Sequence, residues 1–482
     1  MIFRCTPALV PGASVRAKEH RPAQPAKFPV KINMFNSKSI QHLRLRLGLF
    51  MTGGEWAMSL PVVGRRNLRY YWFDGLFAAA SDTIPINYLT LYLLALGATG
   101  SQVGLFTALT SLAAAACLLP GALLVERYGH RKEITVWFGG GLARFALLAL
   151  AFLPFGFTGQ VLIWVVILLS VIRSAAGNLA FPAWMSITGD IIPQEGRGRY
   201  FGSRNLVMGI AGIGMTYLVG EFITRVGSPQ GYQLSLMLAF GVGMFSTYFF
   251  SRIKDQQAGQ PVHSSMSVSL PEIWKGLRAS PVFLSFCFAS ALWNFSINIA
   301  GPFFNVYMVQ DLEFTAAMVG LAAVSISISK LLIQKRVGEI SDRWGPGRVQ
   351  MVCMFLLPIL PFVWIFITQL WQVVVLNLLG GILWGAFELV SFNFLLQLTP
   401  TALRARYSAI FQIVVTVALA GGAALGSGII LWWGYTGIFL ISGLGRIVAA
   451  LFFLRLVNNL RQWEAVAGEP ASVTESAESP AR

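Results

Sequence analysis

The chain has 482 residues, of which 55% are hydrophobic and only 12% are charged, and its formal net charge is +16. Soluble globular proteins carry about 25% charged residues, so this composition excludes an ordinary water-soluble fold and indicates a surface that faces lipid. The positive charge does not indicate a nucleic-acid-binding protein, because the basic residues stand in short clusters between apolar runs.

Residues 1–69 form a basic, proline-containing leader. No sustained apolar core follows its charges, so it lacks the pattern of a signal peptide. We expect either a disordered cytoplasmic arm or a true start at Met34, Met51 or Met58. At the other end, residues 458–482 are predicted to form a disordered tail, because they include a polar, Ser- and Glu-rich stretch.

Twelve apolar stretches are long enough to cross a bilayer, which takes about 20 residues in a helix. In chain order they are 70–96, 103–125, 134–155, 161–187, 206–223, 232–250, 282–309, 318–333, 349–367, 371–396, 407–431 and 435–456. Basic residues gather in the even-numbered loops between them, whereas the odd-numbered loops offer only Arg225. The positive-inside rule then places the even loops and both termini in the cytoplasm of a multi-pass protein of the plasma (inner) membrane.

The two halves of the chain repeat each other. "PQEGRGRY" begins at Pro193 and "PTALRARY" at Pro400, and Gly104 and Gly129 correspond to glycines 216 residues later, at 320 and 345. We therefore predict two six-helix bundles, residues 70–251 and 281–457, joined by a polar cytoplasmic linker at 252–280. Such a repeat implies a pseudo-twofold axis along the membrane normal and a central cavity between the bundles.

A charged, glycine-containing motif follows the second span of each half. The second copy, "GEISDRWGPGR", contains Gly338, Asp342, Arg343, Gly345 and Arg348, and the looser first copy keeps Glu126, Arg127, Gly129 and Arg131. Together with the twelve spans and two halves, it resembles the cytoplasmic G-x-x-x-D-R-x-G signature of the major facilitator superfamily, over roughly residues 68–457. The resemblance implies an all-α integral membrane protein with twelve transmembrane helices in two pseudo-symmetric six-helix bundles.

These motif residues are candidates for a cytoplasmic gate. Glycines permit a tight turn, and Gly338 would let a neighbouring helix pack closely. The carboxylate could sit at the N-terminus of a facing helix or meet an arginine of the other half, but only while the cytoplasmic side is closed. The alternative is a solvated loop whose charges follow membrane topology alone.

Two further signatures bear on transport chemistry. "RSAAG", beginning at Arg173 in the fourth span, resembles the R-x-x-x-G motif of proton-coupled members of the superfamily. The alternative for Arg173 is a structural ion pair. The fifth span lacks the Gly-Pro pair that the superfamily's drug antiporters carry, which lowers the weight of multidrug antiport.

Polar residues at membrane depth form the candidate substrate and coupling cavity. In the superfamily the first and fourth helices of each half line it, which here are spans 1, 4, 7 and 10. The candidates are Asp82, Asn87, Arg173, Asn294, Asn298, Lys330, Glu388, Ser391 and Asn393. We expect Asp82 to face Arg173, and either Asp82 or Glu388 to carry a proton. Arg144 and Arg446 are expected to pair with neighbouring helices away from substrate, and Asp74 to lie at the membrane interface.

The sequence thus predicts a monomeric secondary active transporter of a small organic solute, working by alternating access and coupled to protons. No enzyme, cofactor or metal site is expected, because the four histidines and four cysteines form no catalytic or ligand pattern and no phosphate-binding loop occurs. The alternative is a membrane sensor or a lipid scramblase on the same scaffold. Neither the substrate nor the direction of transport follows from the sequence.

Overall fold

The computed structural model describes residues 46–193, 196–255, 281–398 and 404–467. Residues 48–482 form one compact unit, to which the following description applies. The described part of this unit is built from helices and their connections, with no strand. The predicted tail is wrong for residues 458–467, because these form the end of a helix, α16 (Arg404–Ala467), and not a disordered segment. The rest of the tail, and most of the predicted leader and linker, lie outside the described residues, so the expectations for those segments stay predictions.

The end of the predicted leader is folded, which corrects the expectation of a disordered arm for residues 48–69. A short helix, η1 (Glu55–Ser59), precedes α2 (Val62–Ala95). Phe50 packs edge-on against Trp72 in α2, with ring centroids 6.2 Å apart, and its carbonyl accepts a hydrogen bond from Ser203 Oγ at 2.7 Å. The segment is therefore part of the bundle.

Seven helical elements follow α2 in the part of the first half that the structure describes. They are α3 (Gly100–Tyr128), α4 (Arg131–Ile134), η2 (Thr135–Leu142), α5 (Ala143–Gly156), α6 (Gly159–Ile191), α7 (Arg197–Val226) and α8 (Gln230–Ser251). A capping box begins α3, because the Thr99 hydroxyl accepts from the Gln102 amide while the Gln102 side chain accepts from the Thr99 amide. Gly129 ends α3 with φ at 61°, a left-handed conformation that favours glycine.

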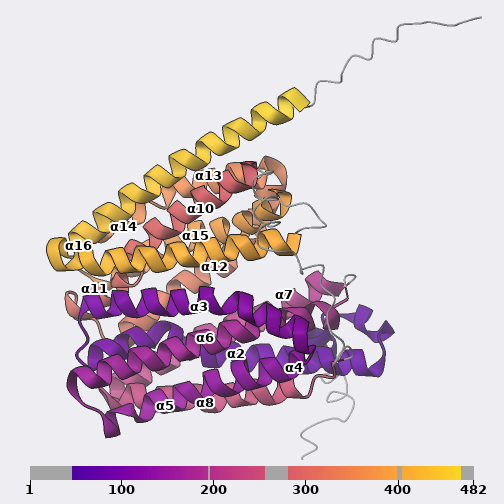
Figure 1. Cartoon of the computed structure of the whole chain (residues 1–482), viewed down its shortest axis with the longest axis horizontal. Coiled ribbons are helices and arrows are strands. Elements are labelled where there is room, and N and C mark those ends of the chain that lie inside the picture. The colour runs from indigo at the N-terminus through magenta and orange to yellow at the C-terminus, as the bar shows by residue number, and fades with distance from the viewer. Residues whose placement is uncertain (1–45, 194–195, 256–280, 399–403, 468–482) are drawn as a thin grey trace, which may run out of the picture. The chain divides into compact units, whose positions relative to one another are not determined.

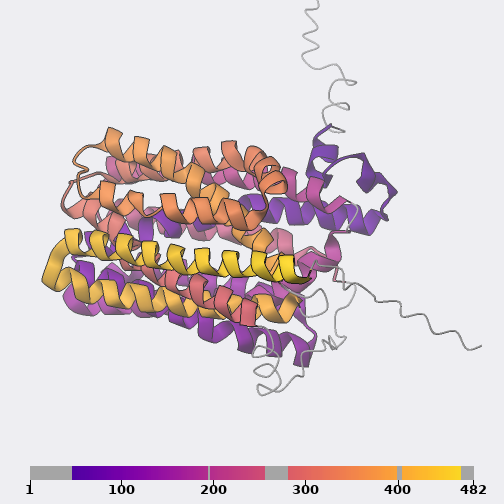
Figure 2. The ribbon, with the colours of Figure 1, turned by 90° about the horizontal axis from the view of Figure 1, so that it is seen from above.

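The second half repeats this plan with more breaks. Its elements are α10 (Pro281–Ala300), α11 (Phe303–Gln310), α12 (Ala316–Trp344), α13 (Pro346–Leu356), α14 (Ile359–Trp364), α15 (Leu370–Leu398) and α16 (Arg404–Ala467). The break between α10 and α11 falls at Gly301 and Pro302, as the sequence suggests. Figures 1 and 2 show α16 as two helices that fold back on each other, and Gly434 is its one non-helical residue.

Ten segments of the described chain are long and apolar enough to cross a membrane. The last, Ile410–Val457, has 48 residues and covers the eleventh and twelfth predicted spans. α2 matches the first predicted span but is not among the ten; it carries Asp74, Asp82 and three arginines near its start. Dividing α16 at Gly434 and adding α2 accounts for each predicted span by position, while twelve crossings of a bilayer stay a prediction.

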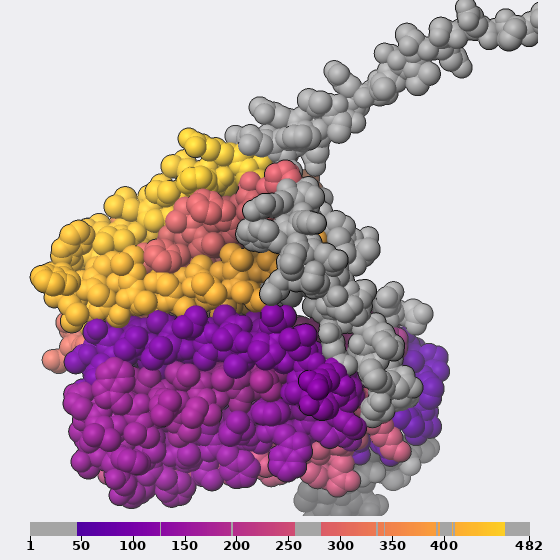
Figure 3. Space-filling model, viewed as in Figure 1, coloured from indigo at the N-terminus to yellow at the C-terminus, as the bar shows by residue number. Residues whose placement is uncertain are grey.

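Contacts between the halves pair α3 with the first arm of α16, and α7 with α12. In Figure 3 the violet surface of α3 meets the gold surface of α16 along a continuous seam. The close approaches need small residues: a Cβ on Gly104 would lie 2.6 Å from the Ser427 Cβ, and one on Gly320 would lie 2.4 Å from the Tyr88 hydroxyl. The Ala317 amide also donates to Thr224 Oγ1 at 3.0 Å.

These approaches lie toward one end of the helices. We call the basic end the one at which α3 gives way to α4, α7 begins and α12 gives way to α13 (Figure 1). Gly104 is near the start of α3 and Ala317 near the start of α12, so both lie toward the opposite end, which we call the distal end. The two halves are thus held tightly at the distal end.

Candidate functional site

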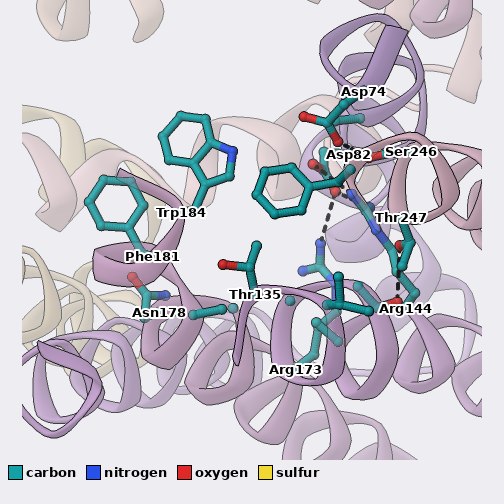
Figure 4. Close-up of a pocket in the computed structure, with 18 of the residues that line it drawn as sticks. Asp74, Asp82, Thr135, Arg144, Arg173, Asn178, Phe181, Trp184, Ser246 and Thr247 are labelled. Atoms are coloured by element: carbon teal, nitrogen blue, oxygen red, sulfur yellow. Dashed lines mark hydrogen bonds and ion pairs between the residues drawn. The ribbon is translucent and has the colours of Figure 1, made fainter. Parts of the chain in front are cut away.

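A cavity of about 530 Å³ lies within the first half, on the basic-end side of mid-helix. Side chains from α2, η2, α5, α6, α7 and α8 line it, as Figure 4 shows for ten labelled residues. η2 is a π-helix, a wider turn found often at functional sites. Its Gly140 lets α8 approach closely, because a Cβ there would lie 2.4 Å from Thr247 Cγ2.

Asp82 on α2 is the centre of a charged cluster in this cavity. Both of its carboxylate oxygens accept from Arg144 on α5, with Nη2 to Oδ2 at 3.2 Å. Arg173 on α6 approaches the same carboxylate, with Nη2 3.9 Å from Oδ1. The expectation that Asp82 and Arg173 face each other agrees with this geometry, but Arg144 holds the shorter, forked contact.

Small residues make room for Arg144 between helices. A Cβ on Gly243 of α8 would lie 2.7 Å from Arg144 Cδ and 2.8 Å from Ser81 Oγ. Arg144 Nη1 donates to Ser81 Oγ at 2.8 Å, and Ser81 in turn donates to the Ala239 carbonyl at 2.6 Å. Arg144 thus pairs with a neighbouring helix, in agreement with the expectation, and also lines the cavity, which the sequence did not indicate.

A second buried cluster lies next to the first, nearer the basic end. Asp74 on α2 is 5% exposed and accepts from Ser246 Oγ at 2.7 Å. Arg204 on α7 has Nη2 3.7 Å from Asp74 Oδ2, donates through Nε to the Tyr71 carbonyl at 3.2 Å, and lies over the Tyr71 ring. Helix packing therefore encloses Asp74, while its expected position at the membrane interface stays a prediction.

The second-half candidates are not gathered into that cavity. Lys330 on α12 and Glu388 on α15 form an ion pair at 2.6 Å, a pairing that sequence reasoning did not identify. Asn294 donates to the Ser290 carbonyl of its own helix, and Asn298 to the Leu419 carbonyl of α16, at 2.8 and 2.7 Å.

The last candidates divide between α15 and the region between the halves. Ser391 Oγ accepts from Gln350 at 3.1 Å, while the side chain of Asn393 lies outside the described residues. Asn87 lines a different cavity, of about 340 Å³, formed otherwise by the second half. These two cavities, as the described residues line them, are separate from each other, and the expected cavity shared by the two halves stays a prediction.

The candidate gate residues of the first half make contacts within that half. Arg131 is 2% exposed and binds Asp190 at the end of α6 and Asp255 after α8, at 2.7 and 2.6 Å. Arg127 is exposed, its guanidinium 5.7 Å from the Tyr128 ring centroid, and the Glu126 side chain lies outside the described residues. Arg131 therefore fastens three segments of one bundle.

In the second copy of the motif, the gate glycines have free space beside them and the basic residues are exposed. A Cβ on Gly338 would meet no atom within 4 Å, so the close helix packing expected there is not found in this conformation. Gly345 has φ at 81°, which fits the expected tight turn. Arg343 and Arg348 are exposed, and the Asp342 side chain lies outside the described residues, so its role as a latch stays a prediction.

Sequence reasoning missed Arg144, Asp74 and Arg204 as cavity residues. Their signal was present, because an arginine in an apolar run must find a partner, and the only acids between positions 70 and 128 are Asp74, Asp82 and Glu126. The described residues contain no group of three or more His, Cys, Asp or Glu that could hold a metal ion.

Long apolar helices around a charged interior cavity define a multi-pass membrane protein with an internal polar site. The chain belongs to the Major Facilitator Superfamily, whose sequence model matches residues 72–305 and 286–478. Members of this family are transporters and not enzymes, as the sequence predicted.

Named relatives and solved structures agree with this assignment. The multi-drug resistance efflux pump PmrA of Streptococcus pneumoniae serotype 4 is 24% identical over 397 residues, covering 80% of this chain and 95% of the pump. The multidrug resistance protein MdtG of Enterobacter lignolyticus is 21% identical, covering 82% and 93%. Among solved structures, the D323A mutant of the nucleoside transporter NupG gives a TM-score of 0.65 at 14% identity, covering 81% of this chain and 99% of that one.

A bacterial homologue of the human lysosomal transporter Spinster, solved in an inward-facing and unoccupied conformation, gives a TM-score of 0.64 at 13% identity. It covers 84% of this chain and 99% of that chain. At these identities the likeness shows the fold alone. The expected all-helical membrane fold of the superfamily is thereby confirmed.

Proposed function

We propose that the protein is a proton-coupled secondary active transporter that exports small amphiphilic organic solutes by alternating access. The observation that carries the proposal is Asp82, an acid held between Arg144 and Arg173 on the wall of a 530 Å³ cavity. The relatives named for multidrug resistance favour export over import. They also outweigh the missing Gly-Pro pair in α7, which runs unbroken from Arg197 to Val226.

Asp82 suits proton coupling because its side chain is partly exposed to the cavity and also lies beside two arginines. Its side chain is 40% exposed, so a proton can reach it, whereas Arg144 is 10% exposed. Protonation of Asp82 removes the negative charge that attracts Arg144 and Arg173. Each arginine is then more stable beside another anion or in another packing arrangement. A proton could in this way change the balance between two conformations of the bundles.

The packing at the distal end supports alternating access. If the basic end is cytoplasmic, as its arginines and lysines favour, the tight seam of α3 with α16 and α7 with α12 closes the external side. The cavity then faces the cytoplasm, the side from which an exporter loads. We place the protein in the plasma (inner) membrane on the same grounds, with the termini cytoplasmic.

Reconstituted protein tests the proposal. In proteoliposomes with an imposed pH gradient, we expect gradient-dependent movement of at least one member of a panel of amphiphilic dyes and aromatic acids. Asp82→Asn should abolish it, whereas Glu221→Gln, which alters an exposed pair with Arg225 on α7, should not. Gradient-independent movement of every solute, or full activity in Asp82→Asn, would refute proton coupling at Asp82.

A further inference from the structure

Arg446 is a charged residue in an apolar helix that has no partner among the residues that the structure describes. It lies within the second arm of α16 and is 2% exposed. Its Nε is buried with no hydrogen-bond partner, and no ion pair or hydrogen bond joins its guanidinium to any residue that the structure describes. A buried charge at membrane depth is costly unless it meets an opposite charge or water. The expectation that Arg446 pairs with a neighbouring helix is therefore not met.

The first half shows what such an arginine normally has. Arg144 is also buried, but Asp82 accepts from it through two oxygens. At the 216-residue offset that relates Gly104 to Gly320, position 82 corresponds to position 298 in the second half. That residue, Asn298, is a neutral amide whose Nδ2 donates a hydrogen bond to the Leu419 carbonyl. The second-half carboxylate at comparable depth, Glu388, is bound by Lys330. The chain thus offers Arg446 no anion within its described residues.

Arg446 lines the cavity of about 340 Å³ between the second half and Asn87. Aromatic rings form part of the wall: Phe304 and Trp364 pack with centroids 4.9 Å apart. Asn305 also lines it, and its amide makes no hydrogen bond to a described residue. The cavity therefore combines one free positive charge, one free amide and an apolar, aromatic wall.

We propose that this cavity is a binding site for an organic acid, whose carboxylate pairs with Arg446 and whose aromatic or apolar body packs on Phe304 and Trp364. A carboxylate matches the planar fork of arginine and the single positive charge. A phosphate dianion fits less well, because Arg446 is the one basic residue among the described residues that line this cavity. Asn305 is placed to hydrogen-bond the carboxylate or a polar group of the body.

This site deepens the proposed function by naming a substrate class, and its role in transport rests on that function. It is separate from the Asp82 cavity, since none of the residues lining one lines the other. A bound organic acid would give Arg446 a negatively charged partner, as Asp82 does for Arg144 within the chain. Occupation would then relieve the unpaired charge only in a conformation in which this cavity is formed.

Calorimetric titration of the purified full-length protein in detergent tests binding without any gradient. The probes are 1-naphthoate and, as a neutral isostere, 1-naphthamide at pH 7. We expect the carboxylate to bind and the amide to bind about tenfold or more weakly, because a hydrogen-bonded charge pair is lost. Equal binding of the two probes, or no binding of the carboxylate, would overturn the proposal.

Variants separate the site from general folding effects. Arg446→Gln should weaken 1-naphthoate about tenfold or more, whereas Arg455→Gln, an exposed arginine of the same helix, should leave it unchanged. Arg446→Gln should also unfold at a temperature no lower than the parent without ligand, because an unpaired buried charge is removed. A retained affinity in Arg446→Gln overturns the site, whatever the transport assay gives.

A weaker variant covers the case in which Arg446→Gln does not fold. Asn305→Ala removes only the free amide and should weaken 1-naphthoate by a fewfold while leaving 1-naphthamide unchanged. Unaltered naphthoate binding would remove Asn305 from the site. Binding of 1-naphthoate with no gradient-dependent transport of any solute would instead refute the proposed function and leave the site standing.

Discussion

Arg144 on α5 and Asp82 on α2 form a forked pair, in which Nη1 donates to Oδ1 and Nη2 donates to Oδ2. Arg173 is farther off, at 3.9 Å from one oxygen. The two arginines therefore have different relations to one acid. Arg144 is built into the packing through Ser81, while Arg173 is 24% exposed on the cavity wall.

Removing Arg144 should therefore affect stability as well as transport. We expect Arg144→Gln to lower the free energy of unfolding by about 1–3 kcal/mol, because Asp82 and Ser81 lose a buried charged donor. Denaturant unfolding in detergent measures this. Arg225→Gln is the control, since that side chain is 77% exposed and should change stability by less than about 0.5 kcal/mol. Equal effects of the two would show that the Asp82 fork contributes nothing.

Removing Arg173 should separate transport from folding. We expect Arg173→Ala to abolish gradient-driven transport while the protein still expresses and unfolds near the parent temperature, because its contact with Asp82 is longer and wetter. Proteoliposome flux and a thermal melt give the two readouts. Unchanged flux would remove Arg173 from the mechanism, and a large loss of stability would make it a structural residue.

The sequence predicted the helical membrane fold well because its signals are local. An apolar run of membrane length and the glycines at 129 and 345 each act within a few residues. The repeat between the halves is likewise read directly from spacing. These features need no knowledge of which helix lies beside which.

The site could be predicted only in part, because helix rotation and partner choice are not local. Asp82 and Arg173 were identified by their depth, but Arg144 competes for the same carboxylate and its reach depends on Gly243 in α8. Lys330 and Glu388 were each found singly, since nothing in the spacing relates α12 to α15. Arg446 has no partner among the described residues, and this depends on which helices surround it, which the sequence does not show.

The Lys330–Glu388 pair should matter little for stability. Its carboxylate side is 59% exposed, and exposed pairs contribute about 0–1 kcal/mol. A double-mutant cycle with Lys330→Gln and Glu388→Gln should give a coupling energy below about 1 kcal/mol by denaturant unfolding. A larger coupling would mean that the pair is desolvated in the dominant state. A loss of transport in either single variant would then assign it a role in the conformational change.

Arg131 should behave as a structural fastener and not as a gate between halves. We expect Arg131→Gln to lower the free energy of unfolding by about 3 kcal/mol, because it leaves the buried Asp255 with a lost charge partner. His130→Gln, an exposed neighbour with a 3.9 Å contact to Glu133, is the control. If Arg131→Gln instead left stability intact and altered the accessibility of the cavity, the gate interpretation of the first motif copy would be restored.

The distal seam should be sensitive to one methyl group. A Cβ on Gly104 would lie 2.6 Å from the Ser427 Cβ and 2.7 Å from Phe303 Cζ, too close for the two halves to stay in contact. Because alanine otherwise favours a helix over glycine, any loss of the seam in Gly104→Ala comes from this clash. We expect the open distal conformation to gain about 1 kcal/mol, or about fivefold in population.

Labelling of a cysteine measures this opening. Thr224→Cys, next to Ala317 across the seam, should react faster with a membrane-impermeant maleimide when the distal end is open, in a background lacking the native cysteines. Gly428→Ala is the matched control, because a Cβ there meets nothing within 4 Å. Equal labelling of Thr224→Cys in the two alanine variants would show that the seam does not hold the distal end closed.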